Sequence, residues 1–292
     1  MRALDWILVI LLLIGIAFLF ANGKVNEEPR RPDVITMPMA DRFSDRPLLP
    51  RSDPRDPVFT VEVKPRTGDA TGTAFAINLA GWWVTAAHVT ESCSELLLVT
   101  EPISRRAVRV DGVIEHDRAD VALLRSRGGG PVLPPVARDL RIGEDGFHVG
   151  FPRGRPGDAR SQLVQRGRWV RGEQTDDRVL AWVERERRPG ELDALAGMSG
   201  GPVLDAQGRV VGVTIATSTR RGYVVSTTNQ PVFDLLGEVE GTWDRPERTP
   251  LDATQLVEDS FDRAGTALRD QLSVVQLVCR YGPGVGRRRG RI

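Results

Sequence analysis

The sequence feature that most constrains the fold is a series of short apolar or alternating segments between Val58 and Leu236, broken by Gly, Asp and Arg. Such segments are typical of β-strands, and no helix-period segment longer than a few turns lies among them. They form two groups of six on either side of a seam at 128–135, which predicts two small β-barrels or a β-sandwich. The expected strands are 58–64, 72–78, 82–87, 95–100, 107–115 and 120–125, then 146–151, 161–171, 178–184, 202–205, 209–216 and 222–227.

The N-terminus carries an unbroken apolar run from Trp6 to Ala21. As a helix this run would span roughly 24 Å, just short of the roughly 30 Å core of a bilayer. Residues 1–22 are therefore expected to be a signal anchor, with residues 6–21 in the membrane, or a cleaved signal peptide. A buried soluble helix of this length would normally carry a polar face. Either form of export places the rest of the chain outside the cytoplasm, anchored in the cell envelope by a single span or secreted after cleavage.

The segments that flank the strand-rich region differ from it in composition and in the spacing of apolar residues. Residues 23–57 are rich in proline and arginine without apolar periodicity, which indicates an extended tether. In the C-terminal extension, 239–292, apolar residues recur at helical spacing and predict a helix over 252–272. A short strand is expected over 273–281, and the Gly- and Arg-rich end, 282–292, is expected to be a disordered basic tail.

Composition excludes several classes of protein. The formal net charge of +1 gives no excess of positive charge to gather phosphates, so no nucleic-acid partner is predicted. Two cysteines exclude a zinc-ribbon module, and three histidines argue against a His-rich metal cage. No metal and no cofactor are predicted.

Three local patterns carry chemistry. The apolar segment WWVTAAHV delivers His88 at its end, Asp120 enters the apolar run VALL, and Ser199 lies in the turn GMSGGPV before a strand. An acyl-transfer serine needs a base within hydrogen-bond reach and a buried carboxylate that fixes the tautomer of that base. His88 and Asp120 can supply these roles if two strands bring them together. The backbone N–H groups of Gly197 and Ser199 would then form a two-donor oxyanion hole.

Each of these patterns also has a purely structural explanation. The glycine-rich segment alone is a tight turn, a histidine that ends a buried strand is commonly a satisfied polar residue, and an aspartate before a strand is commonly a turn residue. The order His, Asp, Ser within one strand-rich region favours the catalytic interpretation.

The segments TAAHV, DVALL and GMSGGPV resemble the three signature segments of the chymotrypsin-fold serine proteases. The segments GWWVTAAHV and VVGVTIA are more similar to bacterial HtrA-type and related trypsin-like peptidases than to digestive enzymes. The resemblance covers about 58–236. It implies an all-β, chymotrypsin-like domain over 58–238, made of two six-stranded antiparallel barrels at about 58–130 and 136–238, with the cleft between them.

The resemblance also assigns side chains to the barrels. His88 and Asp120 would come from the first barrel and Ser199 from the second. Met198 stands where digestive members carry an aspartate that pairs with a freshly cut N-terminus, so that zymogen switch is not available. The extension after 238 is too short for the PDZ module that usually follows an HtrA-type domain, so regulation by peptide capture is not predicted.

Support of the catalytic aspartate is a second departure from the family pattern. The family places a supporting serine in the strand after VVG, and the aligned position in this chain is Ile215. Thr214 and Thr217 are the candidates to replace it.

The specificity pocket is expected on the segment before the nucleophile. In trypsin-like members its base lies six residues before the serine, at Asp193, where a carboxylate would pair with a substrate Arg or Lys. In the HtrA-type geometry Ala194, Leu195 and Ala196 would line the pocket, Asp193 would face solvent, and small apolar side chains would be preferred. The resemblance favours the second geometry.

The two cysteines predict a disulfide. An exported protein with an even cysteine count most often pairs them, so Cys93 and Cys279 are expected to form one bond, which would staple the C-terminal extension onto the first barrel. Two buried free thiols are the alternative.

The function predicted from these residues is a serine endopeptidase that hydrolyses peptide bonds of proteins outside the cytoplasm. Its partners would be a protein or peptide substrate and, through residues 6–21, the membrane. One alternative is a catalytically silent protease-fold binding module in the cell envelope, and another is a non-proteolytic scaffold whose triad-like residues are coincidental. A fluorophosphonate probe separates the peptidase from the silent module, because only an activated serine labels. A variant at Ser199 that behaves as the unmodified protein would identify the scaffold.

Overall fold

The computed structural model of the chain describes residues 45–61, 67–101, 106–171, 174–192, 194–218, 222–239 and 256–282. The predicted anchor or signal segment, residues 23–44 of the predicted tether and residues 283–292 of the predicted tail lie outside these ranges. Across the ranges just given, the helices are all too short or too polar to cross a bilayer.

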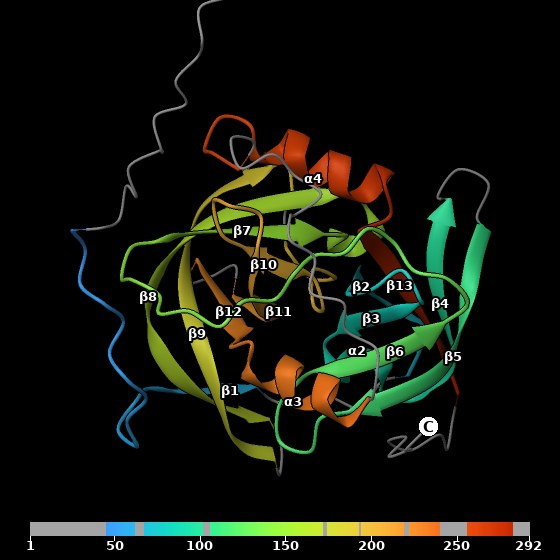
Figure 1. Ribbon diagram of the computed structural model, residues 1–292, viewed down its shortest axis with the longest axis horizontal. Helices are drawn as coiled ribbons and strands as arrows, with labels where there is room; N and C mark the ends of the chain where they lie inside the picture. The colour runs from blue at the N-terminus through green and yellow to red at the C-terminus, as the bar shows by residue number, and fades with distance from the viewer. Residues whose placement is uncertain are drawn as a thin grey trace, which may run out of the picture. The chain divides into compact units, whose positions relative to one another are not determined.

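The first barrel is a closed ring of six antiparallel strands (Figure 1). Their order around the ring is β13-β2-β3-β6-β5-β4. Buried and more exposed side chains alternate in β4, whereas β2 is buried on both faces from Gly72 onward. The strands are β2 (Ala70–Ala76), β3 (Trp82–Thr85), β4 (Cys93–Glu101), β5 (Arg106–Glu115), β6 (Ala122–Ser126) and β13 (Val274–Tyr281).

The second barrel closes through the pairing of β8 with β9, which completes the ring β8-β7-β10-β11-β12-β9. A seventh strand, β1 (Val58–Val61), lies parallel to the end of β8 on the outside of this ring. The ring strands are β7 (Asp145–Gly150), β8 (Gly157–Arg171), β9 (Gln174–Arg188), β10 (Pro202–Leu204), β11 (Val210–Ser218) and β12 (Tyr223–Thr227). The all-β fold with two six-stranded barrels is thus confirmed.

The composition of the first barrel differs from the prediction. The expected first strand, 58–64, was assigned to it, but the described part of that segment forms β1 and pairs with β8 of the second barrel. Its place is taken by β13, which pairs with β2 on one side and β4 on the other. Strand pairing between distant segments is set by tertiary packing, so local pattern alone placed 58–64 in the wrong barrel and gave the strand at 273–281 no partner. The predicted boundary at 238 therefore cuts through the first barrel.

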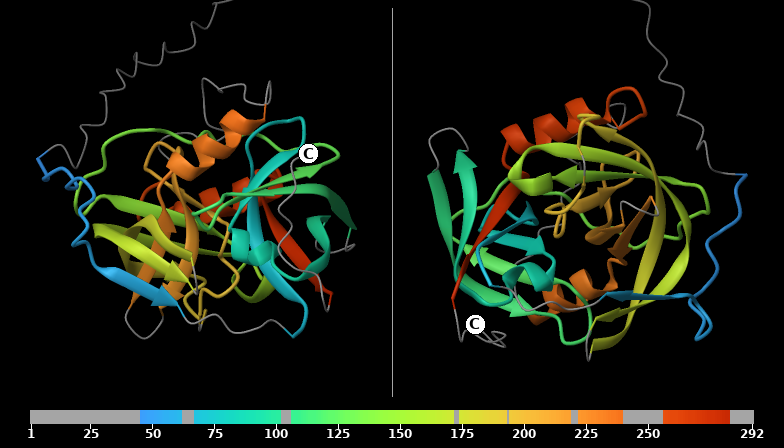
Figure 2. Two further views of the ribbon diagram at one scale, coloured as in Figure 1. Left: turned by 90° about the horizontal axis from the view of Figure 1, so that it is seen from below. Right: turned by 180° about the vertical axis from the view of Figure 1, so that it is seen from behind.

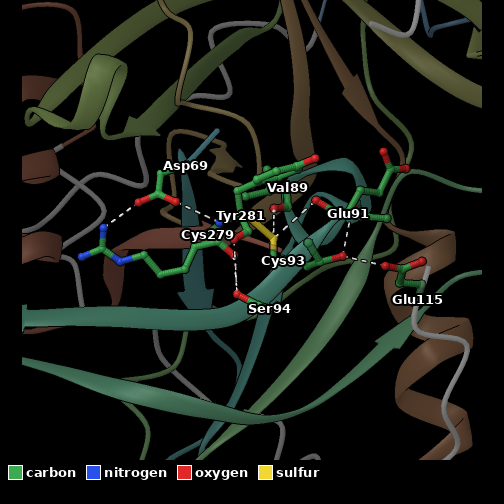
Figure 3. Close-up of a disulfide and its surroundings, with 11 residues drawn as sticks. Asp69, Val89, Glu91, Cys93, Ser94, Glu115, Cys279 and Tyr281 are labelled. Carbon is green, nitrogen blue, oxygen red and sulfur yellow. Dashed lines mark hydrogen bonds and ion pairs between the residues drawn. A yellow bond between two sulfur atoms is a disulfide. The ribbon is translucent and has the colours of Figure 1, made fainter. Parts of the chain in front are cut away.

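A disulfide joins Cys93 on β4 to Cys279 on β13, with 5.3 Å between the Cα atoms (Figure 3). The bond closes a loop with a sequence separation of 186 residues, and a loop of that size stabilises the fold by about 5 kcal/mol in the chain-entropy description. Beside it, Asp69 accepts a hydrogen bond of 2.8 Å from the Tyr281 N–H and forms an ion pair with Arg280. The end of β13 is thereby held to the start of β2.

The described part of the predicted tether lies along the second barrel instead of extending away from it. The Leu49 N–H donates to the Leu140 carbonyl at 2.8 Å, and the Ile142 N–H donates to the Pro47 carbonyl at 3.0 Å. Leu49 is buried. Apolar periodicity could not reveal this packing, because a single buried leucine in a polar segment has no period.

Three α-helices and one 3-10 turn complete the described structure. They are α2 (Ala87–Thr90), the turn η1 (Pro152–Gly154), α3 (Gln230–Glu238) and α4 (Phe261–Asp270). The helix predicted over 252–272 is shorter than expected and begins at Phe261 within the described part. Helix α3 was not predicted, although Pro231 in its first turn and Val232, Leu235 and Leu236 on its buried face are helix signals.

One hydrophobic cluster runs between the two barrels and under both longer helices. It joins Phe75 and Val84 of the first barrel to Phe147 and Val213 of the second, and it continues into Leu235 of α3. Helix α4 contributes Phe261 and Leu268 to the same cluster, and Figure 2 shows this helix against the second barrel while β13, in the same red, runs into the first. The C-terminal extension is therefore part of the core.

Candidate active site

His88 lies in the short helix α2, directly after β3 has ended at Thr85. Its Nδ1 lies 2.7 Å from Oδ2 of Asp120, and its backbone N–H donates to Oδ1 of the same carboxylate at 2.8 Å. The histidine side chain is 22% exposed, whereas that of Asp120 is 2% exposed, so the carboxylate is sealed behind the ring. This is the arrangement in which a buried carboxylate fixes the tautomer and orientation of a histidine.

The ionisation of Asp120 follows from its neighbours. Burial alone raises the pKa of this carboxyl, but attraction to His88, both hydrogen bonds from that residue and the more distant charge of Arg171 outweigh burial, so the net pKa lies below its ordinary value. Ile215 stands where the family places a supporting serine, and the Thr214 hydroxyl bonds to His148 instead. Oδ1 of Asp120, the oxygen that does not face the His88 ring, accepts the hydrogen bond from the His88 backbone N–H.

Ser199 lies in the turn before β10 and packs against the histidine segment. Its carbonyl accepts a hydrogen bond of 2.8 Å from the Thr73 N–H on β2, and a methyl group added at Gly200 would lie 2.9 Å from the backbone nitrogen of Ala86. A side chain at Gly200 would therefore clash with the backbone of Ala86, two residues before His88. The Ser199 hydroxyl lies 3.4 Å from the Ile215 carbonyl. The fold therefore brings the three predicted segments together across the two barrels.

The peptide between Ala196 and Gly197 is oriented by the neighbouring loop. The Ala196 carbonyl accepts a hydrogen bond of 2.6 Å from the Arg153 N–H, and the C=O and N–H of one peptide unit point in opposite directions. The Gly197 N–H therefore points away from Arg153. Among the described residues, no protein acceptor takes a hydrogen bond from the N–H of Gly197 or of Ser199. Gly197 has φ +102°, so a side chain there would be strained.

Thr73 was not singled out from the sequence, although it contacts three parts of this site. Its hydroxyl donates to the Gly197 carbonyl at 2.9 Å and accepts the Phe151 N–H at 3.1 Å. A polar residue in the middle of the buried strand TGTAFA is the signal that could have identified it.

Arg171 and Glu91 form a second feature that the sequence did not reveal. The guanidinium of Arg171, at the end of β8, makes two hydrogen bonds of 2.6 and 2.7 Å to the carboxylate of Glu91, which directly follows α2. A half-buried, two-point ion pair thus ties the second barrel to the helix that carries His88.

The predicted specificity residues fall in different environments. Asp193 lies outside the described residues. Ala194 is partly buried, and Ala196 is exposed. Leu195 is 2% exposed and packs among Met198, Trp182 and other core residues of the second barrel. Its side chain therefore belongs to the barrel interior.

His148 is close to a serine but does not form a competing site. Its Nε2 lies 2.6 Å from the Ser161 hydroxyl and its Nδ1 lies 3.0 Å from the Thr214 hydroxyl, and all three side chains are buried in the second barrel. The Ser161 hydroxyl lies 3.2 Å from the Gly146 carbonyl. Both ring nitrogens are satisfied by hydroxyl groups with the imidazole neutral, and burial lowers the pKa of His148 to about 3. The surroundings are those of a packing residue.

The buried His148 predicts a loss of stability in acid. In the unfolded chain a histidine has a pKa of about 6.5, so the unfolded state binds one more proton than the folded state between that pH and about 3. Stability therefore falls as pH drops through this window, by about 1.4 kcal/mol per pH unit. Urea unfolding at pH 7.5 and 4.5 should show a smaller acid loss for His148→Gln than for the unmodified protein. An equal loss in both proteins would contradict this assignment.

Comparison with known proteins finds one family model and several curated relatives that are similar to this chain. Residues 72–213 match the family model of the trypsin-like peptidase domain. A probable periplasmic serine endoprotease, DegP-like, of Ectopseudomonas mendocina is 28% identical over 205 residues, which cover 68% of this chain and 39% of the relative. The protein with the same description in Brucella suis is 28% identical over 228 residues, covering 70% of this chain and 42% of the relative. The chain thus spans about two fifths of the length of the curated relatives it matches.

Solved structures with some similarity to this chain include two proteases. The HtrA-type protease AlgW with a decapeptide has a TM-score of 0.47 at 19% identity, covering 57% of this chain and 50% of that one. The active form of the Rv3671c protease from M. tuberculosis also has a TM-score of 0.47, at 18% identity, covering 67% of this chain and 94% of that one. By its two barrels, its matched segment and its curated relatives, this chain is similar to the chymotrypsin-fold serine peptidases, with residues 72–213 matching a trypsin-like peptidase domain.

Proposed function

We propose that the protein is a serine endopeptidase in which Ser199 is the nucleophile, His88 the general base and Asp120 the orienting carboxylate. The observation that carries this proposal is the pair of contacts between Asp120 and His88, at 2.7 and 2.8 Å. With the Nδ1 proton donated to Asp120, the lone pair of the imidazole lies on Nε2, where a base must present it to a hydroxyl.

Acylation then proceeds with a balanced transfer of one proton. The Ser199 oxygen forms a bond to the carbonyl carbon of the substrate while its hydroxyl proton moves to His88 Nε2. Negative charge develops on the carbonyl oxygen and is stabilised by the N–H groups of Gly197 and Ser199. When the C–N bond breaks, the His88 imidazolium gives that proton to the leaving amine, and an acyl-enzyme remains.

Deacylation repeats these steps with water as the nucleophile. His88 takes a proton from water as the water oxygen attacks the acyl carbon, and the same two N–H groups stabilise the oxyanion. The proton returns to the Ser199 oxygen as the ester bond breaks. The products are a free carboxylic acid, which releases its proton to solvent and becomes a carboxylate, and the original enzyme. The cycle therefore needs no metal or cofactor.

The substrates proposed are proteins outside the cytoplasm. The apolar run at residues 6–21 supports export with a membrane anchor or a cleaved signal, and a disulfide is typical of oxidising compartments. The relatives described as periplasmic support the same compartment. For the side chain before the cut, the resemblance to HtrA-type peptidases supports a preference for small apolar residues over a pocket floored by Asp193, with Leu195 contributing to the barrel interior and not to the pocket.

A fluorophosphonate probe tests the proposed function directly. The protein should become labelled at a single site, and mass spectrometry of the digested adduct should place the phosphonyl group on Ser199. His88→Ala should abolish labelling because the serine then lacks its base. If the folded protein remains unlabelled, the silent binding module replaces the peptidase as the better interpretation.

A further inference from the structure

The oxyanion hole depends on a loop that the C-terminal extension contacts. This loop, residues 151–156 between β7 and β8, is called the oxyanion loop here. The Arg153 N–H holds the Ala196 carbonyl at 2.6 Å, and the loop packs so closely on Gly197 that an added methyl group would lie 2.6 Å from the Phe151 carbonyl oxygen. The position of the Gly197 N–H is therefore set by the position of this loop.

Arg269 of helix α4 contacts the backbone at both ends of the oxyanion loop. One guanidinium nitrogen lies 3.4 Å from the Gly150 carbonyl oxygen, at the end of β7, and 3.4 Å from that of Gly157, at the start of β8. The same group makes two hydrogen bonds of 2.7 and 2.8 Å to the carboxylate of Asp158. The Arg269 side chain is 8% exposed, so this contact lies inside the fold.

The ion pair beneath the loop is costly to bury. Burial raises the pKa of the Asp158 carboxyl even against the opposing attraction of Arg269. A buried ion pair often contributes little net stability compared with apolar packing. We assign this pair a positioning role: the guanidinium bonds both carboxylate oxygens of Asp158 and, at the same time, lies near the two carbonyl oxygens that flank the loop.

The other element of the extension contacts the tip of the same loop. A methyl group added at Gly154 would lie 2.9 Å from the side-chain nitrogen of Gln276, which is on β13. Strand β13 is fixed in the first barrel by its two neighbours and by the disulfide at Cys279. The oxyanion loop thus lies between α4 at its base and β13 at its tip.

We propose that Arg269 is a positioning residue for the oxyanion hole, and that the C-terminal segment 256–282 completes the active site by holding the oxyanion loop. The chain of contacts runs from Arg269 to Gly150 and Gly157, through Arg153 to the Ala196 carbonyl, and so to the Gly197 N–H. This inference rests on the proposed peptidase function.

The test compares Arg269→Lys with a matched control on the same helix. Lysine keeps a positive charge beside Asp158, but its side chain ends one bond short of the guanidinium nitrogen that lies near both carbonyls. The ion pair therefore survives while the two carbonyl contacts are lost. Asp262→Asn removes a different ion pair between α4 and the second barrel, that with Arg188 at 3.2 Å, and leaves the Arg269 contacts with Asp158, Gly150 and Gly157 in place. Both variants are made in the full chain and assayed on fluorescein-labelled casein.

Arg269→Lys should lower kcat by about tenfold, less than the loss of a whole oxyanion donor, with KM little changed. Binding of a peptide trifluoromethyl ketone, whose hydrated or Ser199-bound oxygen occupies the oxyanion hole, should weaken by a similar factor. Asp262→Asn should keep the activity of the unmodified protein. Gln276→Ala, which touches only the tip of the loop, should show a smaller loss of kcat and serves as a second variant if Arg269→Lys fails to fold.

Three results would overturn the inference: kcat unchanged in both Arg269→Lys and Gln276→Ala, an equal loss of kcat in Asp262→Asn, or a loss confined to KM. These results differ from a failure of the proposed function, because in that case the unmodified protein would itself leave casein intact and remain unlabelled by the fluorophosphonate.

Discussion

Replacing Ser199 with alanine is expected to lower casein hydrolysis by a factor of about 10⁴ or more. The variant loses the atom that forms the acyl-enzyme, and only substrate binding and the oxyanion hole remain. The fold should persist, because among the described residues the Ser199 hydroxyl makes a single long contact, of 3.4 Å, to the Ile215 carbonyl. Initial rates on labelled casein, with far-UV circular dichroism as a check on folding, measure both expectations.

Ser161 provides the matched control for this substitution. It is the serine beside the other buried histidine, His148, at 2.6 Å. Ser161→Ala should keep its activity at neutral pH below its unfolding temperature, since no substrate reaches a fully buried hydroxyl. If Ser199→Ala stays active while Ser161→Ala does not, the nucleophile has been assigned to the wrong barrel position.

Asp120→Asn is expected to cost a factor of about 10⁴ in kcat at neutral pH. Asparagine keeps the size of the side chain but can present its amide N–H to His88 Nδ1, which moves the ring proton to Nε2 and removes the base. In the unmodified protein the pKa of Asp120 lies below its ordinary value of 3.8, so this carboxylate is fully charged between pH 5 and 7. Any loss of activity over that pH range should therefore not reflect the titration of Asp120. A pH–rate profile of kcat/KM on labelled casein measures both effects.

Asp117→Asn is the control for the loss at Asp120. Asp117 lies on the same loop, three residues upstream, and is exposed. Its substitution should leave kcat within about twofold of the unmodified protein, as is usual for surface changes. Equal losses in the two variants would indicate a disturbed loop and would argue against an orienting carboxylate at Asp120.

The extension gives this domain a feature that its resemblance to HtrA-type peptidases did not predict. Residues 256–282 supply one barrel strand, one half of the disulfide and the arginine that grips the oxyanion loop. A truncation before α4 would therefore remove part of the core and not a separate module.

The sequence by itself determined those features of this protein that depend on residues close together along the chain. Strand alternation, turn residues and the segments around His88, Asp120 and Ser199 depend on neighbours a few positions away, and they predicted the all-β class, most strand positions and the three segments that meet at the site. The position of helix α4 was also visible in its apolar spacing, although its start was placed too early.

Only the tertiary structure decided which distant segments pair and what they hold. Two short apolar strands, β1 and β13, look equally able to complete the first barrel, and the choice depends on contacts with β2, β4 and β8 that lie far away in sequence. The same holds for Arg269, one arginine among many in an arginine-rich chain, which acquires its contacts only when α4 packs beneath the oxyanion loop. Strand pairing and long-range side-chain contacts depend on how the whole domain packs. The free energy that selects them comes from burial of apolar surface between elements, and not from the conformational preferences of any one segment.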